Sequence, residues 1–193
     1  TLLKSITDRR QFHRISDTKG YSGAYLYDIY SLFCNSCVNN ESFEDWFALN
    51  YPDQAEFAAI YDDILREFEE TKVQFNYADF NDLLIKMRNE LKNGSAICFD
   101  EILVDEYQDT NSLQGSLIDA FNTKSLFCVG DFDQSIYAFN GANIEIIGSF
   151  KERYIGANIY SLNINYRSSA KILALANKVI ANNPRLYPKS LEV

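Results

Sequence analysis

Hydrophobic residues recur at spacings of three and four through the first part of the chain. The clearest case is the stripe Phe57, Ile60, Ile64, Leu65 and Phe68, which is set against strongly acidic intervening positions. This spacing places apolar side chains on one face of an α-helix, so we expect the stripe to pack into a core. Similar patterns occupy the ranges 24–38, 42–50 and 76–92.

Farther along the chain, short continuous apolar runs replace the helical spacing. They occupy residues 97–104, 125–129 and 157–162. Short apolar runs are typical of strands, and residues 102–104 suit a strand that is buried on both faces of a parallel sheet. Helical patterns separate or follow them at residues 112–121, 143–151 and 168–182. We therefore expect an all-helical segment over residues 1–74 and an α/β portion with a parallel sheet over residues 75–193.

Local signals mark several helix ends. Ser42, with Asp45 three positions later, resembles a capping box in which Asp replaces Glu. Pro52 suits the first turn of a helix, and Asn93-Gly94 is typical of a helix C-terminus.

Two acids, Asp105 and Glu106, directly follow the apolar residues 102–104. In open α/β sheets, ligands bind at the carboxyl ends of the strands. One carboxylate there can hold Mg²⁺, a hard cation that prefers carboxylate oxygen and water, and its neighbour can polarise an attacking water. This is the arrangement of a Walker B strand in a nucleotide hydrolase. The same pattern also fits a strand that ends in a solvated acidic turn.

A second polar cluster, GDFDQSIYAFNGA at residues 130–142, follows the run at 125–129. The neutral amide of Gln134 can reach a phosphate or a water without adding charge. Tyr137 and Phe139 follow on an expected short helix, where aromatic rings can stack on nucleic-acid bases. The alternative is that both rings belong to the core.

A third cluster, LNINYRSS at residues 162–169, follows the run at 157–162. Arg167 lies beside an expected helix start, where its planar guanidinium can clamp phosphate oxygens. Tyr166 can stack on a purine. The alternative is a helix N-cap at Ser168 with an ordinary surface arginine beside it.

The charge of the chain is unevenly distributed. The formal net charge is −9, which argues against a surface that grips the phosphate backbone everywhere. Residues 1–20 contain five Lys or Arg and two acids, whereas residues 21–70 contain one Arg and eleven acids. A basic strip at the start could still meet nucleic acid, while the acidic stretch is expected to face water or another protein.

The four cysteines indicate a reducing compartment. Cys98 and Cys128 lie in apolar runs and are expected to be small buried hydrophobes. Cys34 and Cys37 have CxxC spacing, but a metal site needs further ligands and His13 is the only histidine, so we interpret the spacing as incidental. No run reaches the roughly 18 apolar residues of a membrane span, and no signal-peptide pattern opens the chain. We expect a cytoplasmic protein with reduced thiols.

In their order along the chain, VDEYQDTN, VGDFDQSIYAFNGA and LNINYRSS resemble the UvrD/Rep/PcrA group of superfamily-one DNA helicases. The resemblance extends from about Phe75 to Pro184 and includes FNYADFNDLL, which is similar to the segment that returns from a helical insert to the motor domain. Residues 1–72 match by position and helical character only. The resemblance implies an incomplete RecA-like P-loop NTPase motor domain plus an all-helical insert.

The same resemblance implies a motor that hydrolyses ATP with Mg²⁺ and moves on single-stranded DNA, in the three-prime to five-prime direction, to unwind duplex DNA. By position, Asp105 would hold Mg²⁺ and Glu106 would activate water. Gln134 would link the γ-phosphate to the DNA-contacting segment that follows it. Tyr166 would stack on adenine and Arg167 would act as an arginine finger. Tyr137 and Phe139 would touch DNA bases.

Two departures from the family pattern stand out. Asn140 occupies a position where the family usually has Arg, and nothing in the chain matches GxxxxGK[ST], the loop that cradles phosphates. The chain starts at Thr1 and is expected to be a fragment that is inactive alone, and an unpaired sheet edge could lead it to self-associate. The alternatives are a DNA- or protein-binding module with a vestigial ATP site and the helicase arm of a helicase–nuclease.

Overall fold

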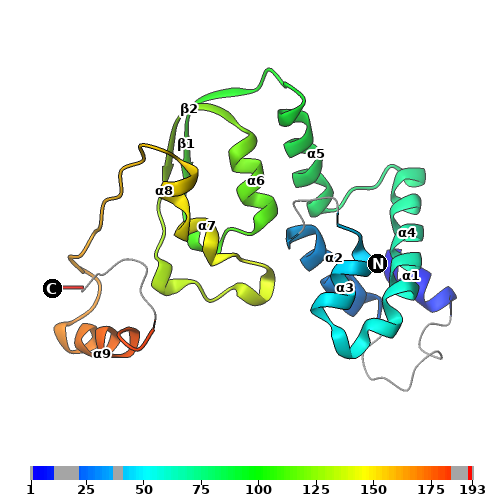
Figure 1. Ribbon diagram of the computed structural model, residues 1–193, viewed down its shortest axis with the longest axis horizontal. Helices are drawn as coiled ribbons and strands as arrows, with labels where there is room; N and C mark the ends of the chain where they lie inside the picture. The colour runs from blue at the N-terminus through cyan, green and yellow to red at the C-terminus, as the bar shows by residue number, and fades with distance from the viewer. Residues whose placement is uncertain (1, 11–21, 37–40, 184–190, 193) are drawn as a thin grey trace. The chain divides into compact units, whose positions relative to one another are not determined.

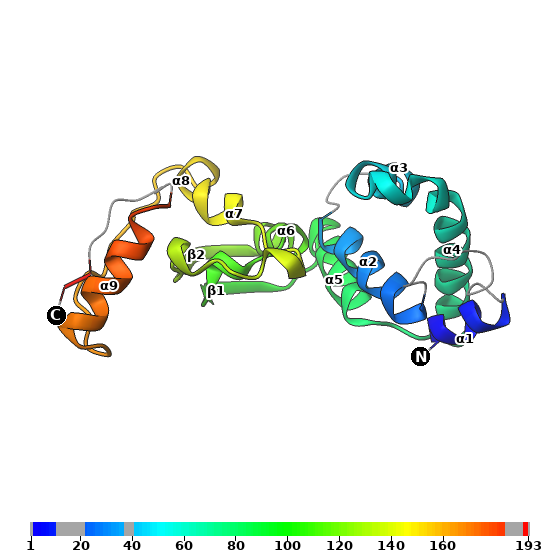
Figure 2. The ribbon, with the colours of Figure 1, turned by 90° about the horizontal axis from the view of Figure 1, so that it is seen from below.

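The computed structural model describes residues 2–10, 22–36, 41–183 and 191–192 (Figures 1 and 2). The chain divides into two compact units. The first comprises Thr1–Ile102 and Asn111–Ser125, and the second comprises Leu103–Thr110 and Leu126–Val193. The predicted boundary between residues 74 and 75 falls at the end of a helix and stays a prediction. No helix within the described ranges combines the length and the apolar composition needed to cross a bilayer.

The first unit is built mainly from helices. They are α1 (Leu2–Arg9), α2 (Gly23–Ser36), α3 (Phe43–Asn50), the 3-10 helix η2 (Pro52–Phe57), α4 (Ala58–Phe75), α5 (Phe80–Lys92) and α6 (Ser112–Ala120). Ser42 caps α3 by accepting a hydrogen bond from the Asp45 N–H, Pro52 opens η2, and Asn93 ends α5. Helices are thus present, among the described residues, where the helical patterns at 24–38, 42–50, 57–68 and 76–92 predict them.

Helices α1, α2, α3 and α4 share a hydrophobic core. Its members are Leu3, Ile6, Leu26, Ile29, Tyr30, Cys34, Phe43, Trp46, Phe47, Ala58, Tyr61, Ile64, Leu65 and Phe68. The stripe predicted on α4 faces this core, with its first two members only partly buried. Gly23 allows α2 to approach α1, because a Cβ atom there would lie 2.5 Å from the Cα of Lys4. Helices α5 and α6 pack against each other and against α2.

The N-terminal arginines that the structure describes are paired with acids of α4. Arg9 is bonded to Glu67, and Arg10 to both Asp63 and Glu67. The hydrogen bond to Asp63 raises the pKa of Arg10 further above its ordinary value, against the opposing effect of burial. These two arginines therefore pair with two acids of α4, and whether the basic strip meets nucleic acid stays a prediction. Lys4 is exposed on α1, and the remaining basic residues of the strip, Arg14 and Lys19, lie outside the described residues, as does His13.

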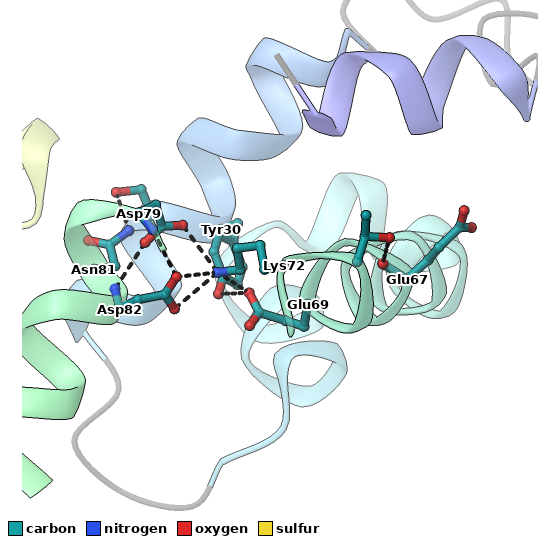
Figure 3. Close-up of polar contacts among 9 residues, drawn as sticks. Tyr30, Glu67, Glu69, Lys72, Asp79, Asn81 and Asp82 are labelled. Atoms are coloured by element: carbon teal, nitrogen blue, oxygen red, sulfur yellow. Dashed lines mark hydrogen bonds and ion pairs between the residues drawn. The ribbon is translucent and has the colours of Figure 1, made fainter. Parts of the chain in front are cut away.

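A buried lysine links α4 to α5 (Figure 3). The side chain of Lys72, only 5% exposed, forms ion pairs with Glu69 at 2.6 Å, Asp82 at 2.9 Å and Asp79 at 3.2 Å. Asp79 and Asp82 also form the capping box that begins α5. The Lys72 ammonium lies 4.8 Å from the ring centroid of Phe68. Lys72 therefore holds the end of one helix against the start of the next.

The sheet has two strands, β1 (Cys98–Val104) and β2 (Asn122–Cys128), which are hydrogen-bonded neighbours and lie side by side in both views (Figures 1 and 2). The Val129 N–H donates to the Val104 carbonyl at 2.8 Å, and the Val129 carbonyl accepts from the Tyr107 N–H at 2.8 Å. Val129 thus bonds to two different residues that follow one another along the neighbouring segment, as residues of parallel strands do. The chain is therefore a helix-rich α/β protein with a small parallel sheet.

Two expectations about the strands are wrong. Leu103 and Phe127 are 69% and 55% exposed, so β1 and β2 are not buried on both faces. Because the described sheet has two strands, each of them is an edge strand and neither has the cover of a central one. Likewise Cys98 is exposed, whereas Cys128 is partly buried. Cys34 is buried as a core residue and burial raises its pKa to about 12, while Cys37 lies outside the described residues.

The second unit continues from the strand ends. It contains the 3-10 helices η3 (Tyr107–Asp109), η4 (Phe132–Gln134) and η5 (Ala138–Asn140), followed by the helices α7 (Ile144–Gly148), α8 (Phe150–Arg153) and α9 (Ala170–Ile180). The strand expected at 157–162 does not form. Among the described residues this stretch has no neighbouring strand, and the nearby bridge joins only Ile164 and Glu192. Strands without a hydrogen-bonding neighbour are not stable in water.

Candidate active site

Asp105 and Glu106 lie at the carboxyl end of β1, and both are exposed. The backbone of Glu106 is left-handed, with φ 49° and ψ 43°, a conformation that side chains other than glycine adopt at an energetic cost. The Glu106 N–H donates to the Asp105 carboxylate at 2.9 Å. The turn therefore places two adjacent exposed carboxylates at the end of the strand.

A second turn follows β2. Asp131 begins η4, where its carboxylate accepts hydrogen bonds from the Asp133 N–H at 3.1 Å and from the Gln134 side-chain amide at 2.7 Å. Gln134 is exposed. In this arrangement Gln134 is oriented by Asp131, and its carbonyl oxygen is the group left to accept a hydrogen bond from a ligand or a water.

Gln108 joins the two turns and was not among the residues that the sequence singled out. Its side chain is buried. Its Nε2 donates to the Glu106 carboxylate at 2.7 Å, and its Oε1 accepts from the Asp131 N–H at 2.9 Å. The residue stands in the motif VDEYQDTN, but an amide within a turn of acids resembles an ordinary surface residue, so the sequence gives no sign that it is buried.

Gly130 leaves room for this contact. A Cβ atom at Gly130 would lie 2.9 Å from Oε1 of Gln108 and 3.0 Å from the side chain of Ile147. The first distance is shorter than a real Cβ contact and the second is tight, so a larger residue at position 130 would displace the Gln108 amide.

Tyr107 anchors the first turn through contacts with Phe150 and Arg153. Its buried ring packs edge-on against Phe150, with 5.6 Å between the ring centroids, and Arg153 donates to its hydroxyl at 3.3 Å. Burial raises the pKa of Tyr107, so the phenol stays neutral. The Asn143 N–H also donates to the Thr110 carbonyl at 3.0 Å. Helices α7 and α8 thus hold the turn that carries Glu106 and Gln108.

Tyr137 directly precedes η5, and Phe139 lies within it. Their side chains are 43% and 70% exposed, and their ring centroids lie 5.9 Å apart at an interplanar angle of 46°. The alternative that they are core aromatics is therefore wrong for the described structure. Rings that are exposed in this way are open to stacking by a planar ligand.

Tyr166 and Arg167 are also exposed. Asn165 accepts hydrogen bonds from the N–H groups of Arg167 at 2.9 Å and of Ser168 at 2.7 Å, so the turn before α9 is shaped by Asn165. The N-cap of α9 is Ser169, not the expected Ser168. Among the described residues, no hydrogen bond or ion pair joins the side chain of Tyr166 or Arg167 to Asp105, Glu106 or Gln134. Their roles at the site stay predictions.

Across the described ranges, no group of three or more His, Cys, Asp or Glu side chains could hold a metal ion by itself. This does not conflict with the chemistry of Mg²⁺, which keeps several waters and takes one or two carboxylates together with substrate phosphates. Asp105 can supply such a carboxylate.

Comparison with known proteins identifies the class. Residues 4–155 match the family model described as the UvrD/REP helicase N-terminal domain, and this match covers more than half of the chain. The chain belongs to this helicase family.

The relatives are named as DNA helicases. A probable DNA helicase II homolog of Mycoplasma capricolum is 44% identical over 135 residues, which are 66% of this chain and 18% of that protein. The corresponding Rickettsia conorii protein is 40% identical over 137 residues, covering 66% of this chain and 21% of its own length. The ATP-dependent DNA helicase PcrA of Staphylococcus aureus is 44% identical over 121 residues, covering 58% and 17%. The chain thus matches about a fifth of the length of these relatives.

Proposed function

We propose that the chain is part of an ATP-dependent DNA helicase and provides one wall of its nucleotide site. One observation carries this proposal: Glu106, Gln108, Asp131 and Gln134 form a continuous hydrogen-bonded series that joins the ends of two parallel strands. In α/β proteins this edge of the sheet is where ligands bind. The names of the relatives agree with this assignment.

Each residue has a role in the proposed reaction. Asp105 holds Mg²⁺, which neutralises charge on the phosphates, and Glu106 accepts the proton of the attacking water. One N–H of the Gln134 side-chain amide is bonded to Asp131, and its second N–H donates to the γ-phosphate and links it to the DNA-contacting segment that follows. Tyr166 stacks on adenine and Arg167 stabilises charge on the transferred phosphoryl group. The whole protein, with a RecA-like motor, uses this reaction to move on single-stranded DNA, in the three-prime to five-prime direction, and to unwind duplex DNA.

The experiment that tests the proposal is ATP hydrolysis by the full-length protein, measured with and without single-stranded DNA. We expect turnover that requires Mg²⁺ and rises with DNA. Hydrolysis that is absent under both conditions, while the protein still binds DNA, would favour a binding module with a vestigial ATP site.

The 193-residue polypeptide alone should be inactive, since it contains no GxxxxGK[ST] loop to supply the backbone N–H groups and the lysine that bind phosphates. We expect its phosphate release to equal that of its own Glu106→Gln variant. DNA-stimulated turnover that is lost on Glu106→Gln would contradict this prediction. The expected self-association through a sheet edge also stays a prediction.

Tyr137 and Phe139 are proposed to stack on DNA bases. Base–aromatic stacking contributes about 1–3 kcal/mol per base, so Tyr137→Ala and Phe139→Ala should each weaken binding of single-stranded DNA by about 5- to 150-fold. The measurement is the fluorescence anisotropy of a labelled oligonucleotide with the full-length protein at one fixed salt concentration, because salt changes such affinities strongly.

A second pair of exposed rings provides the matched control. Phe75 and Tyr77 also lie 5.9 Å apart, but they belong to the end of α4 and the loop after it. Phe75→Ala and Tyr77→Ala should leave the affinity for DNA unchanged. Equal losses for the two pairs would show that exposed aromatic area, rather than the position of η5, sets the affinity.

A further inference from the structure

Gln108 occupies a position that requires both a hydrogen-bond donor and an acceptor. Its side chain is 2% exposed and contacts groups of opposite hydrogen-bonding character. The Asp131 N–H can only donate, so the oxygen of the amide must face it, and the Glu106 carboxylate can only accept while it is ionised, so the nitrogen must face that side. A carboxylate, a lysine or an apolar residue at position 108 cannot satisfy both partners.

The backbone of Gln108 also contacts the second turn, because its carbonyl accepts a hydrogen bond from the Ser135 hydroxyl at 3.3 Å. The side-chain Nε2 of Gln108 also lies 3.4 Å from the Asp109 carboxylate. The second turn is therefore attached to Gln108 at Asp131 and again at Ser135, with Gly130 allowing the close approach. Any displacement of the segment that contains Gln134 must change the hydrogen bonds of Gln108.

Glu106 depends on this contact for its orientation. Its carboxylate is exposed and stands on a left-handed backbone, and the Gln108 amide is the side-chain donor that the structure gives it. An exposed carboxylate without such a partner samples several rotamers, and a displacement of about 1 Å of a catalytic group can lower a rate about 10²-fold.

We propose that Gln108 is a positioning residue that aims the Glu106 carboxylate and couples it to the Asp131–Gln134 turn. This inference rests on the proposed ATP hydrolysis, in which Glu106 accepts the proton of the attacking water. Gln108 touches neither nucleotide nor water in this scheme. It acts by making the orientation of the base depend on the position of the turn that carries Gln134.

The test uses the full-length protein and separates kcat from KM. Gln108→Leu removes both hydrogen bonds at similar size, and we expect kcat for ATP to fall about 10²-fold while KM for ATP changes less than about threefold. Hydrogen exchange at the peptide that contains Asp131 should become faster, because its N–H loses its acceptor. The control is Asn81→Leu, which removes another buried amide, bonded to Ser31 far along the chain from the site, and should leave kcat unchanged.

Gln108→Glu adds a readout that a general loss of packing would not change. The new carboxylate can still accept from the Asp131 N–H but, while it is ionised, has no proton to donate to Glu106. We therefore expect kcat to fall as in Gln108→Leu, while hydrogen exchange at the peptide that contains Asp131 stays at the wild-type rate. This variant also decides the matter if Gln108→Leu does not fold.

The outcomes distinguish the two proposals. If the wild-type protein hydrolyses ATP and Glu106→Gln abolishes turnover, but Gln108→Leu and Gln108→Glu both keep wild-type kcat, the positioning role is wrong and the proposed function stands. A kcat loss as large for Asn81→Leu as for Gln108→Leu also overturns it. If the wild-type protein does not hydrolyse ATP at all, both proposals fall.

Discussion

Glu106→Gln should lower the ATP turnover of the full-length protein by about 10²- to 10⁴-fold, the range over which a general base contributes. The substitution keeps the size and polarity of the side chain but removes its ability to accept a proton from the attacking water. Asp105 and the rest of the turn keep their places, because the Glu106 N–H still donates to Asp105. ATP binding should therefore persist. The measurement is phosphate release at saturating ATP and single-stranded DNA, together with the equilibrium affinity for ATP.

Glu101→Gln is the matched control. Glu101 is an exposed acid in the same strand, and its carboxylate accepts a hydrogen bond from Ser125 at 3.3 Å, away from the strand end. The same chemical change there should leave turnover within about twofold of wild type, as expected for a surface site that is far from the reacting groups. Turnover that survives Glu106→Gln would mean that another group accepts the proton, and the role of Glu106 would have to be abandoned.

Sequence reasoning located the two strand ends but not the link between them. The apolar runs before Asp105 and before Gly130 predict parallel strands, and parallel strands bring their carboxyl ends to one edge. That argument places Glu106 and Gln134 near each other, and the structure connects them through Gln108 and Asp131. Gln108 itself could not be found this way, because its partner Asp131 and the neighbouring Gly130 lie more than twenty positions later in the chain.

The errors in the prediction also have physical causes. An apolar run such as 157–162 shows that a segment can form a strand, but a strand needs a neighbour, and the run does not say whether one exists. The expected burial of Leu103 failed for the same reason, since burial on both faces requires layers that two strands do not provide. The helices of the first unit were easier to predict, because an amphipathic stripe is a local signal and can pack against any apolar surface nearby.

Lys72 is the other residue whose importance is invisible in the sequence. It stands in ETKVQF near the end of α4, where a lysine normally points to solvent and supports the helix C-terminus. Here the chain turns back after Asn76, whose left-handed backbone ends α4, and brings Asp79 and Asp82 against the ammonium group. Burial lowers the pKa of Lys72, but the hydrogen bonds to Glu69 and Asp82 outweigh it, so its pKa lies above the ordinary value of 10.5.

Lys72→Met should therefore destabilise the chain by about 3–5 kcal/mol, the usual cost of removing one partner from a buried ion pair. The substitution keeps the apolar stem but leaves three carboxylates close together without a cation. Urea unfolding of the 193-residue chain, followed by the fluorescence of its single tryptophan, Trp46, reports on this loss because Trp46 is buried in the core of the first unit. Since folded proteins are stable by only about 5–15 kcal/mol, the midpoint should fall steeply.

Lys124→Met separates burial from charge. Lys124 also pairs with an acid, Asp100 at 2.6 Å, but their side chains are 79% and 88% exposed, so the same substitution there should cost no more than about 1 kcal/mol.

The pH dependence of the stability follows from the raised pKa of Lys72. Its stabilisation is fully present below the ordinary value of 10.5 and is lost as the pH rises through the higher pKa of the folded state, so the gap between wild type and Lys72→Met should narrow in strongly alkaline solution. Equal urea midpoints for Lys72→Met and Lys124→Met would mean that the link between α4 and α5 rests on apolar packing alone.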